Sequence, residues 1–260
     1  MNFLKDIVWS PVDYKNTAVI AREAANELFE RLDWMTVKPT VVLDLGCGTG
    51  DDSVRLQQRY PDAKVLAVDN AYSMVEHAQL GFPCCVCALA EALPLPNQSV
   101  DLIFASMLLP WHVDHKRIFK EWKRVLRPNG LLIFNALGLD TLKECSALFE
   151  VEATPQLNDM HDVGDGLLAA GFSDPVLDVN YFTTVYRSQE KLIAELVGSG
   201  MLAQASASSL LNQLIPEEDG TYPLTYEVIN AHAFAPEKSE RQVLSDGEVK
   251  VPLSQLRRSL

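Results

Sequence analysis

The sequence lacks a long apolar segment and a recognisable export signal. None of its apolar runs approaches the roughly 18 residues that a membrane-spanning helix requires. Residues 1–10 contain one apolar cluster, without the basic start, long apolar stretch and small-residue cleavage site of a secretory signal. We therefore expect a soluble protein with no membrane partner, and the cytoplasm as its location.

Positive charge is also scarce. The 260 residues include 22 Lys and Arg against 35 Asp and Glu, which gives a formal net charge of -13. Such a chain repels the phosphates of a nucleic acid unless a local basic patch reverses the field. Nucleic acid is therefore not an expected partner.

Cysteine is present without a disulfide or metal-site pattern. Five cysteines in a chain of this length do not indicate a disulfide framework, which agrees with a reducing compartment. Cys84 and Cys87 have C-x-x-C spacing, but no second pair or histidine cluster accompanies them in the sequence. A strand of small buried residues that includes Cys85 explains them better, and no metal is expected.

Predicted helices and strands alternate through the first half of the chain. Residues 17–33 carry apolar side chains at helical spacing, and residues 40–45 form a short β-branched run typical of a buried parallel strand. Further predicted helices cover 53–60, 73–80 and 116–126, and further strands cover 64–68, 84–88, 101–106 and 131–135. This alternation indicates an α/β fold with a doubly wound parallel sheet, whose ligands lie beyond the carboxyl ends of the strands.

The pattern loosens after about residue 138. We predict a helix over 141–149, a short helix over 163–170, a strand with a break over 176–186, and a cap or loop over 198–222. At 260 residues the chain is long enough for one α/β domain that carries a smaller cap.

A glycine-rich turn follows the first predicted strand. Residues 46–50 read Gly-Cys-Gly-Thr-Gly, and glycine at alternate positions lets the backbone turn sharply and approach a ligand closely. Asp69 ends the second predicted strand, where its carboxylate can accept hydrogen bonds from both hydroxyls of a ribose. An ordinary tight turn is the alternative for the glycines alone, and Asp44 either contacts a ligand or caps the turn.

The charges around this turn favour one class of cofactor. The turn reads G-x-G-x-G rather than G-x-G-x-x-G, and Asp51 and Asp52 follow it directly. A pyrophosphate at this helix start would meet two carboxylates, whereas S-adenosylmethionine (SAM) has no phosphate and carries positive amino and sulfonium groups. We therefore expect SAM as the cofactor.

Several segments resemble known methyltransferases. Residues 43–50, Leu-Asp-Leu-Gly-Cys-Gly-Thr-Gly, resemble the first motif of class I SAM-dependent methyltransferases, and residues 90–96, 99–103 and 125–132 resemble their later landmarks. Narrower matches over 137–144, 159–165, 170–176, 224–228 and 232–234 are similar to the malonyl-acyl carrier protein methyltransferases of biotin synthesis.

The resemblance implies methyl transfer from SAM to the free carboxylate of a malonyl thioester on acyl carrier protein, which would be the partner. It places the cofactor contacts on Asp44, Gly46, Cys47, Gly48, Gly50, Asp69, Asn70, Met74, Ala90, Glu91 and Ser106. Three positions depart from the family pattern: Leu89 replaces an aspartate that contacts the adenine amino group, Ser106 replaces another polar residue, and Pro110 replaces a glutamine. The alternatives are a methyltransferase for another small acid and a non-catalytic relative that acts as an assembly factor.

The expected organisation is a single compact, monomeric domain. Residues 1–136 are expected to form the SAM-binding Rossmann-like core with an N-terminal helix, and residues 137–260 the remaining core strands with a substrate lid.

The chemistry requires few catalytic groups. A malonyl carboxylate is ionised at neutral pH, so it can attack a methyl group without a general base, provided that it is aligned and that water is excluded. On the resemblance and on their location outside the predicted core, the candidate catalytic and substrate-contacting residues are Tyr14, Trp111, Lys143, His161 and Arg187. Each has a structural alternative: the two aromatic residues pack in the core, the histidine caps a helix, and the two cations are solvated.

A basic stripe is predicted on the helix over 116–126. Lys116, Lys120, Lys123 and Arg127 lie at i, i+4, i+7 and i+11 and share one face. Acyl carrier proteins are acidic, so this stripe is a candidate docking surface, with a solvated helix face as the alternative.

Overall fold

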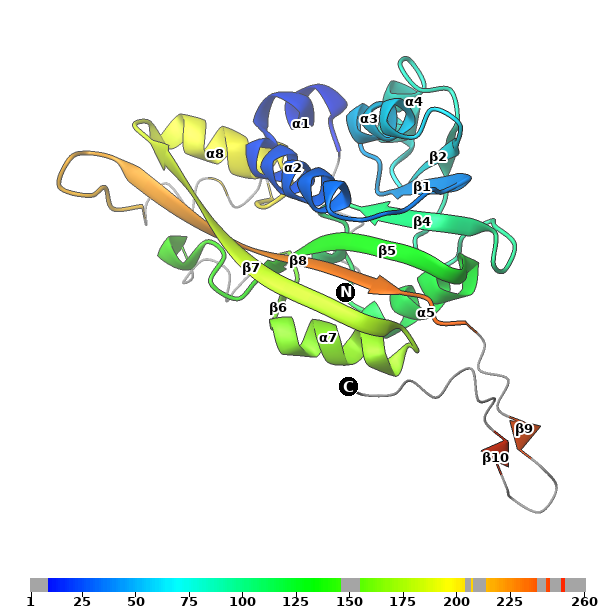
Figure 1. The fold of residues 1–260 in the computed structure, drawn as a ribbon. Coiled ribbons are helices and arrows are strands. Elements are labelled where there is room, and N and C mark those ends of the chain that lie inside the picture. The colour runs from blue at the N-terminus through cyan, green and yellow to red at the C-terminus, as the bar shows by residue number, and fades with distance from the viewer. Residues whose placement is uncertain are drawn as a thin grey trace.

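A twisted sheet runs through the described part of the protein (Figure 1). The computed structural model describes residues 9–145, 155–203, 207 and 214–237, and the backbone of residues 242–243 and 249–250. In order across the sheet, the strands are β3 (Cys85–Cys87), β2 (Lys64–Asp69), β1 (Val41–Leu45), β4 (Val100–Ala105), β5 (Leu126–Gly138), β8 (Tyr222–Phe234) and β7 (Ser173–Tyr186). The short strand β6 (Leu157–Asn158) pairs with the end of β5, and β9 (Gln242–Val243) pairs with β10 (Val249–Lys250) in a separate two-stranded sheet.

The first five strands form the predicted parallel sheet. β1 pairs in parallel with β2 and β4, β2 pairs with β3, and β4 pairs with β5. The α/β doubly wound architecture is thereby confirmed, with one addition: β8 runs antiparallel to both β5 and β7. The carboxyl ends of the parallel strands all lie along one edge of the sheet, where ligands bind in open α/β folds.

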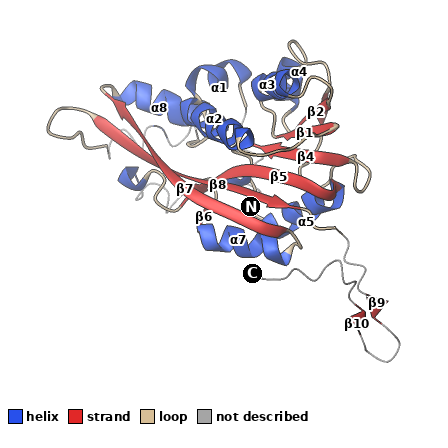
Figure 2. Cartoon of the chain, in the orientation of Figure 1, coloured by secondary structure: helices blue, strands red, loops and turns tan. Residues whose placement is uncertain are grey.

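Helices cover both faces of the sheet (Figure 2). α2 (Val19–Asp33), α3 (Asp51–Arg59) and α4 (Tyr72–Ala78) pack on one face, and α5 (His115–Val125) and α7 (Met160–Ala169) pack on the other. Side chains alternate along each strand, so Leu43 and Leu45 of β1 face α5 while Val42 faces α2. Burial on both faces explains why these strands are nearly continuous apolar runs.

Two further helices and two short 3-10 turns shape the carboxyl edge of the sheet. They are α1 (Pro11–Thr17), α8 (Gln189–Gly198), η2 (Leu109–Trp111) and η3 (Lys143–Cys145). Ser10 caps α1, because its hydroxyl accepts from the Asp13 amide at 3.3 Å, and Ser188 caps α8 in the same way. α1 lies against α8, so the two helices form a cover over this edge.

The second half of the chain differs in detail from the prediction. The helix expected over 141–149 is limited, among described residues, to η3, and positions 146–149 lie outside them. β7 runs without the expected break, while α8 and β8 were not predicted as a helix and a strand. The expected division at residue 136 falls inside β5, and the strands that follow join the same sheet.

The cysteines around β3 lie at an edge of the sheet. Cys85 is buried, but Cys84 and Cys87 are exposed, so the expectation of three buried small residues is wrong for two of them. Among the described strands, β3 is the edge strand and pairs only with β2, so its residues are covered less completely than those of the central strands. Within the described residues, no group of three or more His, Cys, Asp or Glu side chains is arranged to hold a metal ion.

In the described part of the chain, no helix is long and apolar enough to cross a bilayer.

Candidate cofactor and substrate site

The glycine-rich turn closes the end of β1. The amides of Gly46 and Cys47 donate to the carbonyl of Val68 at 2.8 and 3.0 Å, and the Gly50 amide donates to the Cys47 carbonyl at 2.9 Å. Gly46 has φ +77°, and a Cβ there would lie 2.9 Å from Cδ1 of Leu108. The turn therefore needs glycine both for its backbone and for the close approach of the loop after β4.

Asp69 ties this turn to the end of β2. Its Oδ2 accepts from the Gly48 amide and its Oδ1 from the Ala71 amide, each at 2.9 Å. Burial raises the pKa of Asp69, and the backbone hydrogen bonds from Ala71 and Gly48 oppose that rise. Each carboxylate oxygen retains a lone pair for a ribose hydroxyl, as the sequence predicted for this position.

Asp44 lies beneath the turn and is almost completely buried. The Ser53 hydroxyl donates to its Oδ2 at 2.5 Å. Burial raises the pKa of Asp44 well above its usual range, the charge of Asp52 adds to the rise, and the hydrogen bond from Ser53 opposes it. Asp44 also lines a cavity, so it is placed both to brace the turn and to face a ligand.

Three neighbouring cavities lie along the carboxyl edge of the sheet. The largest, about 530 Å³, is the turn cavity, and its lining includes Asp44, residues 46–49, Asp51, Asp52 and the side chains of Arg22 and Glu23. The second, about 50 Å³, is the Asp69 cavity, lined by Trp9, Tyr14, Gly46, Gly48, Asp69, Asn70, Met74, Ser106, Met107, Leu108, Trp111 and His112. The third, about 20 Å³, is the inner cavity, lined by Tyr14, residues 17–21, Met107, Trp111, Glu195, Ser199, Met201 and Tyr226.

Tyr14 belongs to all three cavities. Its side chain, on α1, is therefore at the point where they meet, and Met107 and Trp111 separate the Asp69 cavity from the inner cavity. The indole of Trp9 meets Trp111 edge to face at 5.1 Å between ring centroids, and meets Tyr14 at 5.8 Å. These three rings, which we call the aromatic cage, cover the centre of the site.

Most of the predicted cofactor residues lie around these cavities. Those that line one are Asp44, Gly46, Cys47, Gly48, Asp69, Asn70, Met74 and Ser106. Gly50 belongs to the turn and precedes the first residue of α3, whereas Ala90 packs in the core and Glu91 lies against His112 behind the Asp69 cavity. The cofactor assignments of Ala90 and Glu91 are therefore not supported as direct cavity contacts.

The five substrate-side candidates separate into two groups. Tyr14 and Trp111 meet in the aromatic cage, but Lys143, His161 and Arg187 are exposed and line none of the three cavities. His161 lies at the start of α7, where its Nδ1 is 3.0 Å from the carboxylate of Asp159. The roles given to these three residues remain predictions that the geometry does not support.

Several lining residues were missed from the sequence. Met107, Leu108 and His112 directly follow the end of β4, where ligands are expected in this fold, so their position was a usable signal. Trp9, Glu195 and Met201 come from segments far from the turn, and no local pattern marks them. Tyr226 lies in the family-like segment 224–228 but was not predicted as a site residue.

The donor set fits SAM. The acidic Glu23, Asp44 and Asp52 suit its positive amino and sulfonium groups, and Arg22 in the same cavity suits its carboxylate. Asp69 suits the ribose, beside Asn70 and Met74. The turn cavity, at about 530 Å³, lies in the usual range for a small-molecule site.

Comparisons with known proteins agree with this geometry. A family described as Methyltransferase domain matches residues 43–134. The YcgJ protein from Bacillus subtilis, a solved structure, superposes with a TM-score of 0.63 over 82% of this chain and 99% of its own, at 15% identity, and so supports the fold alone.

Closer relatives define the family. The malonyl-[acyl-carrier protein] O-methyltransferase of Methylovorus sp. (strain MP688) is 37% identical, covering 90% of this chain and 88% of its own length. The protein of the same name from Gallionella capsiferriformans (strain ES-2) is 36% identical, covering 86% of each chain. This chain is an enzyme that uses SAM, and it belongs to the malonyl-[acyl-carrier protein] O-methyltransferase family.

Proposed function

We propose that this enzyme methylates the free carboxylate of a malonyl thioester carried by acyl carrier protein, a step of biotin synthesis. When bound, SAM supplies an electrophilic methyl group, so that a carboxylate oxygen gains an O–CH3 bond as the S–CH3 bond breaks, leaving a methyl ester and S-adenosylhomocysteine. The observation that carries the proposal is Tyr14, a hydroxyl donor at the junction of the cofactor and inner cavities.

Tyr14 is suited to hold a carboxylate without neutralising it. Burial raises the pKa of Tyr14, and the charges of Asp52 and Asp69 raise it further, so the phenol stays protonated at neutral pH. A neutral hydroxyl orients the anion by one hydrogen bond, whereas a cation would also stabilise its charge and weaken the nucleophile. Among the described residues, the Asp69 cavity and the inner cavity are lined by no Lys or Arg.

The residues around the inner cavity are proposed to face the acyl end of the site; at about 20 Å³ the cavity has room for about one water molecule, so it must widen to admit an acyl group. Met201 and Tyr226 give it apolar walls, and Ser199 lies beside them. Burial raises the pKa of Glu195, while the nearby Tyr186 hydroxyl and the charge of Arg22 lower it. A raised pKa favours the neutral carboxyl group, which reduces repulsion of an acidic substrate.

Docking of the carrier is proposed at the start of α5. His112 lines the Asp69 cavity and α5 begins three residues later, so the first turns of this helix lie beside the site. Lys116, Arg117 and Lys120 are exposed there and can meet an acidic partner. We call these three residues the docking cations.

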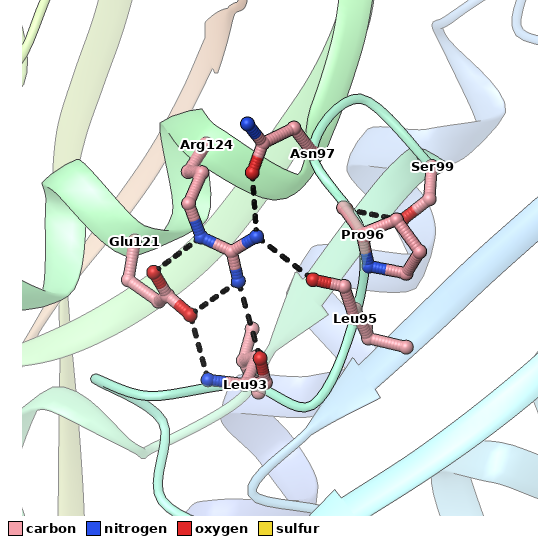
Figure 3. A network of polar contacts seen from close by, with 7 residues as sticks. All are labelled: Leu93, Leu95, Pro96, Asn97, Ser99, Glu121 and Arg124. Atoms are coloured by element: carbon pink, nitrogen blue, oxygen red, sulfur yellow. Dashed lines mark hydrogen bonds and ion pairs between the residues drawn. The ribbon is translucent and has the colours of Figure 1, made fainter.

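The second half of the predicted stripe is engaged elsewhere. Burial lowers the pKa of Lys123, and the Arg127 guanidinium donates to both carboxylate oxygens of Asp101 at 2.8 Å. Arg124 is also committed, because it donates to Glu121 and to the loop over residues 93–97 (Figure 3). The proposed surface is therefore shorter than the stripe read from the sequence.

The first experiment replaces Tyr14 with Phe. Loss of a hydrogen bond to a charged group costs about 1.5 to 3 kcal/mol, so kcat/KM for malonyl-acyl carrier protein should fall about 10-fold to 150-fold. Binding of S-adenosylhomocysteine and the melting temperature should stay near the unsubstituted values, because the ring remains. Tyr72→Phe, at a tyrosine that is 71% exposed, is the matched control.

An assay of methyl transfer from labelled SAM completes this test, with the malonyl group supplied on acyl carrier protein and, separately, on coenzyme A. Transfer to the carrier-bound group, with a loss in Tyr14→Phe and none in Tyr72→Phe, supports the proposal. Unchanged turnover in Tyr14→Phe removes the hydroxyl from the mechanism, and transfer to another small acid alone would refute the proposed substrate.

A second experiment tests the docking cations. The double variant Lys116→Glu/Lys120→Glu should raise KM for the carrier substrate and spare turnover of malonyl-coenzyme A or another small thioester. Lys38→Glu/Lys64→Glu makes the same charge change at exposed lysines before β1 and at the start of β2, the opposite edge of the sheet. Equal losses in the two double variants, or equal effects on both substrates, would contradict docking at α5.

A further inference from the structure

Glu91 and His112 form a buried acid–imidazole pair behind the Asp69 cavity. His112 is 6% exposed, and its Nδ1 lies 3.8 Å from Oε2 of Glu91. In the described part of the protein, that carboxylate oxygen is buried and accepts no hydrogen bond. A buried carboxylate oxygen without a hydrogen-bond donor costs free energy, so a hydrogen bond from the His112 imidazole to Oε2 of Glu91 would be favourable.

The path of the loop after β4 places His112 on one side of the cavity. Leu108 in this loop contacts the turn after β1, because the position of a Cβ on Gly46 would lie 2.9 Å from its Cδ1. Four residues later, His112 has reached Glu91, which follows β3. The loop therefore runs from the turn after β1 to the segment that follows β3.

This side of the cavity is where a base attached to the ribose would lie. Asp69 ends β2 and lines the Asp69 cavity, whereas the turn cavity is lined by residues of α2, of the turn after β1 and of α3. With the ribose on Asp69, the base is expected to occupy the part of the Asp69 cavity that Asn70, Met74 and His112 line. The expected acceptor at position 89 is absent, because Leu89 is apolar and 49% exposed.

The imidazole of His112 can act as a hydrogen-bond acceptor if Glu91 holds it in one tautomer. Burial lowers the pKa of His112; the charge of Glu91 opposes this and the neighbouring His115 adds to it. A neutral imidazole with its N–H on Nδ1, facing the carboxylate, has a free lone pair on Nε2. The 3.8 Å gap is about 1 Å longer than a charge-assisted hydrogen bond, so a small rotation would close it.

We propose that His112, oriented by Glu91, accepts a hydrogen bond from the exocyclic amino group of the adenine of SAM. His112 is the binding residue and Glu91 is the positioning residue, and together they take the place of the acidic side chain missing at Leu89. The proposal concerns recognition of the cofactor and not of the carrier-bound substrate. It can therefore fail while the proposed methylation stands, and the proposed methylation can fail while this proposal stands.

The experiment compares two ligands that differ at one group of the base. Titration calorimetry with S-adenosylhomocysteine and with S-inosylhomocysteine, which carries a carbonyl oxygen in place of the amino group, gives the ratio of their Kd values. The unsubstituted enzyme should favour the adenosyl ligand about 10-fold or more, the effect of one hydrogen bond to a buried acceptor. In His112→Leu the ratio should fall to near 1, and Leu89→Asp added to that variant should restore the preference.

His77→Leu is the matched control, because His77 lies on α4 and lines none of the three cavities. It should keep the ratio of the unsubstituted enzyme. Glu91→Ala provides a second route if His112→Leu does not fold, because the imidazole remains but loses its orientation, and the ratio should fall in the same direction. A ratio that stays unchanged in His112→Leu or, where that variant does not fold, in Glu91→Ala overturns the proposal. So does an unsubstituted enzyme that binds both ligands equally.

Discussion

A single methyl group at Gly200 should disturb the aromatic cage. Gly200 follows α8 with φ +80°, and a Cβ there would lie 2.6 Å from Cη2 of Trp9 and 3.2 Å from Cη2 of Trp111. Gly200→Ala therefore combines a backbone cost of about 1 to 2 kcal/mol for the left-handed conformation with an overpacking cost of about 1 to 3 kcal/mol. The two indoles must move by several tenths of an ångström, and both line the cavity that contains Asp69.

A second glycine separates these two costs. Gly220 has φ +78°, and a Cβ there would meet nothing within 4 Å, so Gly220→Ala carries the backbone cost alone. Thermal melting should place Gly200→Ala below Gly220→Ala by roughly 2 to 4 °C for each kcal/mol of overpacking. In methyl transfer assays kcat should fall about 10-fold or more in Gly200→Ala only, since a misplacement of about 1 Å can cost 100-fold. Equal melting temperatures and equal kcat in the two variants would refute the reasoning.

Three further changes test the framework around the site. Gly138→Ala would place a Cβ 2.2 Å from Cδ of Glu227, so unfolding measurements should show a loss of about 1 to 3 kcal/mol that Glu227→Ala partly relieves. Burial raises the pKa of Asp101, but its hydrogen bonds lower it to about 2, so its contribution is complete above about pH 4 and is lost as pH falls toward 2. Asp101→Asn should therefore remove about 1 to 2 kcal/mol at pH 7, after solvent screening, and flatten the acid limb of the stability curve. Arg124→Met removes the donor that holds Glu121 and the loop over 93–97, and chemical denaturation should show a loss of about 1 to 3 kcal/mol in the free energy of unfolding. For each of the three variants, an unchanged free energy of unfolding would contradict the role given to the residue.

The strands of the first half could be predicted because they are buried on both faces, so their consecutive residues are apolar. Leu102 and Phe104 face α2 while Ile103 faces α5, and all three are fully buried. An uninterrupted apolar run between turn residues is therefore a sufficient signal for this layer. The glycine-rich turn and Asp69 were predictable for the same reason, since each directly ends a strand.

The strands of the second half carry buried polar residues that hide their pattern. Asn230 of β8 is fully buried, and its amide donates to Glu27 of α2 at 2.5 Å, while Asn180 of β7 donates to the same carboxylate at 2.6 Å. A polar residue whose partner lies 203 positions away looks like a solvent-facing residue in the sequence. Neither the extent of β8 nor its antiparallel direction could therefore be derived from local pattern.

The lack of long-range information in local sequence pattern also explains why only some of the substrate-side candidates line a cavity. Tyr14, Trp111, Lys143 and Arg187 were all predicted from the resemblance and from a location outside the predicted core, and these two criteria do not separate cavity-lining residues from solvated ones. The structure leaves Lys143 and Arg187 exposed, and the inner cavity is lined instead by residues such as Glu195 and Met201, which lie in no motif.

The cover over the site should open before the rest of the fold. α1 has seven residues, none of them fully buried, whereas four of the five residues of β1 are fully buried. A helix this short is marginal without packing, so its stability depends on its cap at Ser10 and on its contact with α8. Hydrogen exchange should therefore show α1 amides exchanging well before those of β1, and slower exchange in α1 when S-adenosylhomocysteine is bound beneath Tyr14.

Because Tyr14 lines all three cavities, local opening of α1 exposes the three cavities together. This opening is the expected route by which both the cofactor and the acyl group enter. Exchange of α1 at the same rate as β1, with and without ligand, would show that the cover opens only with global unfolding.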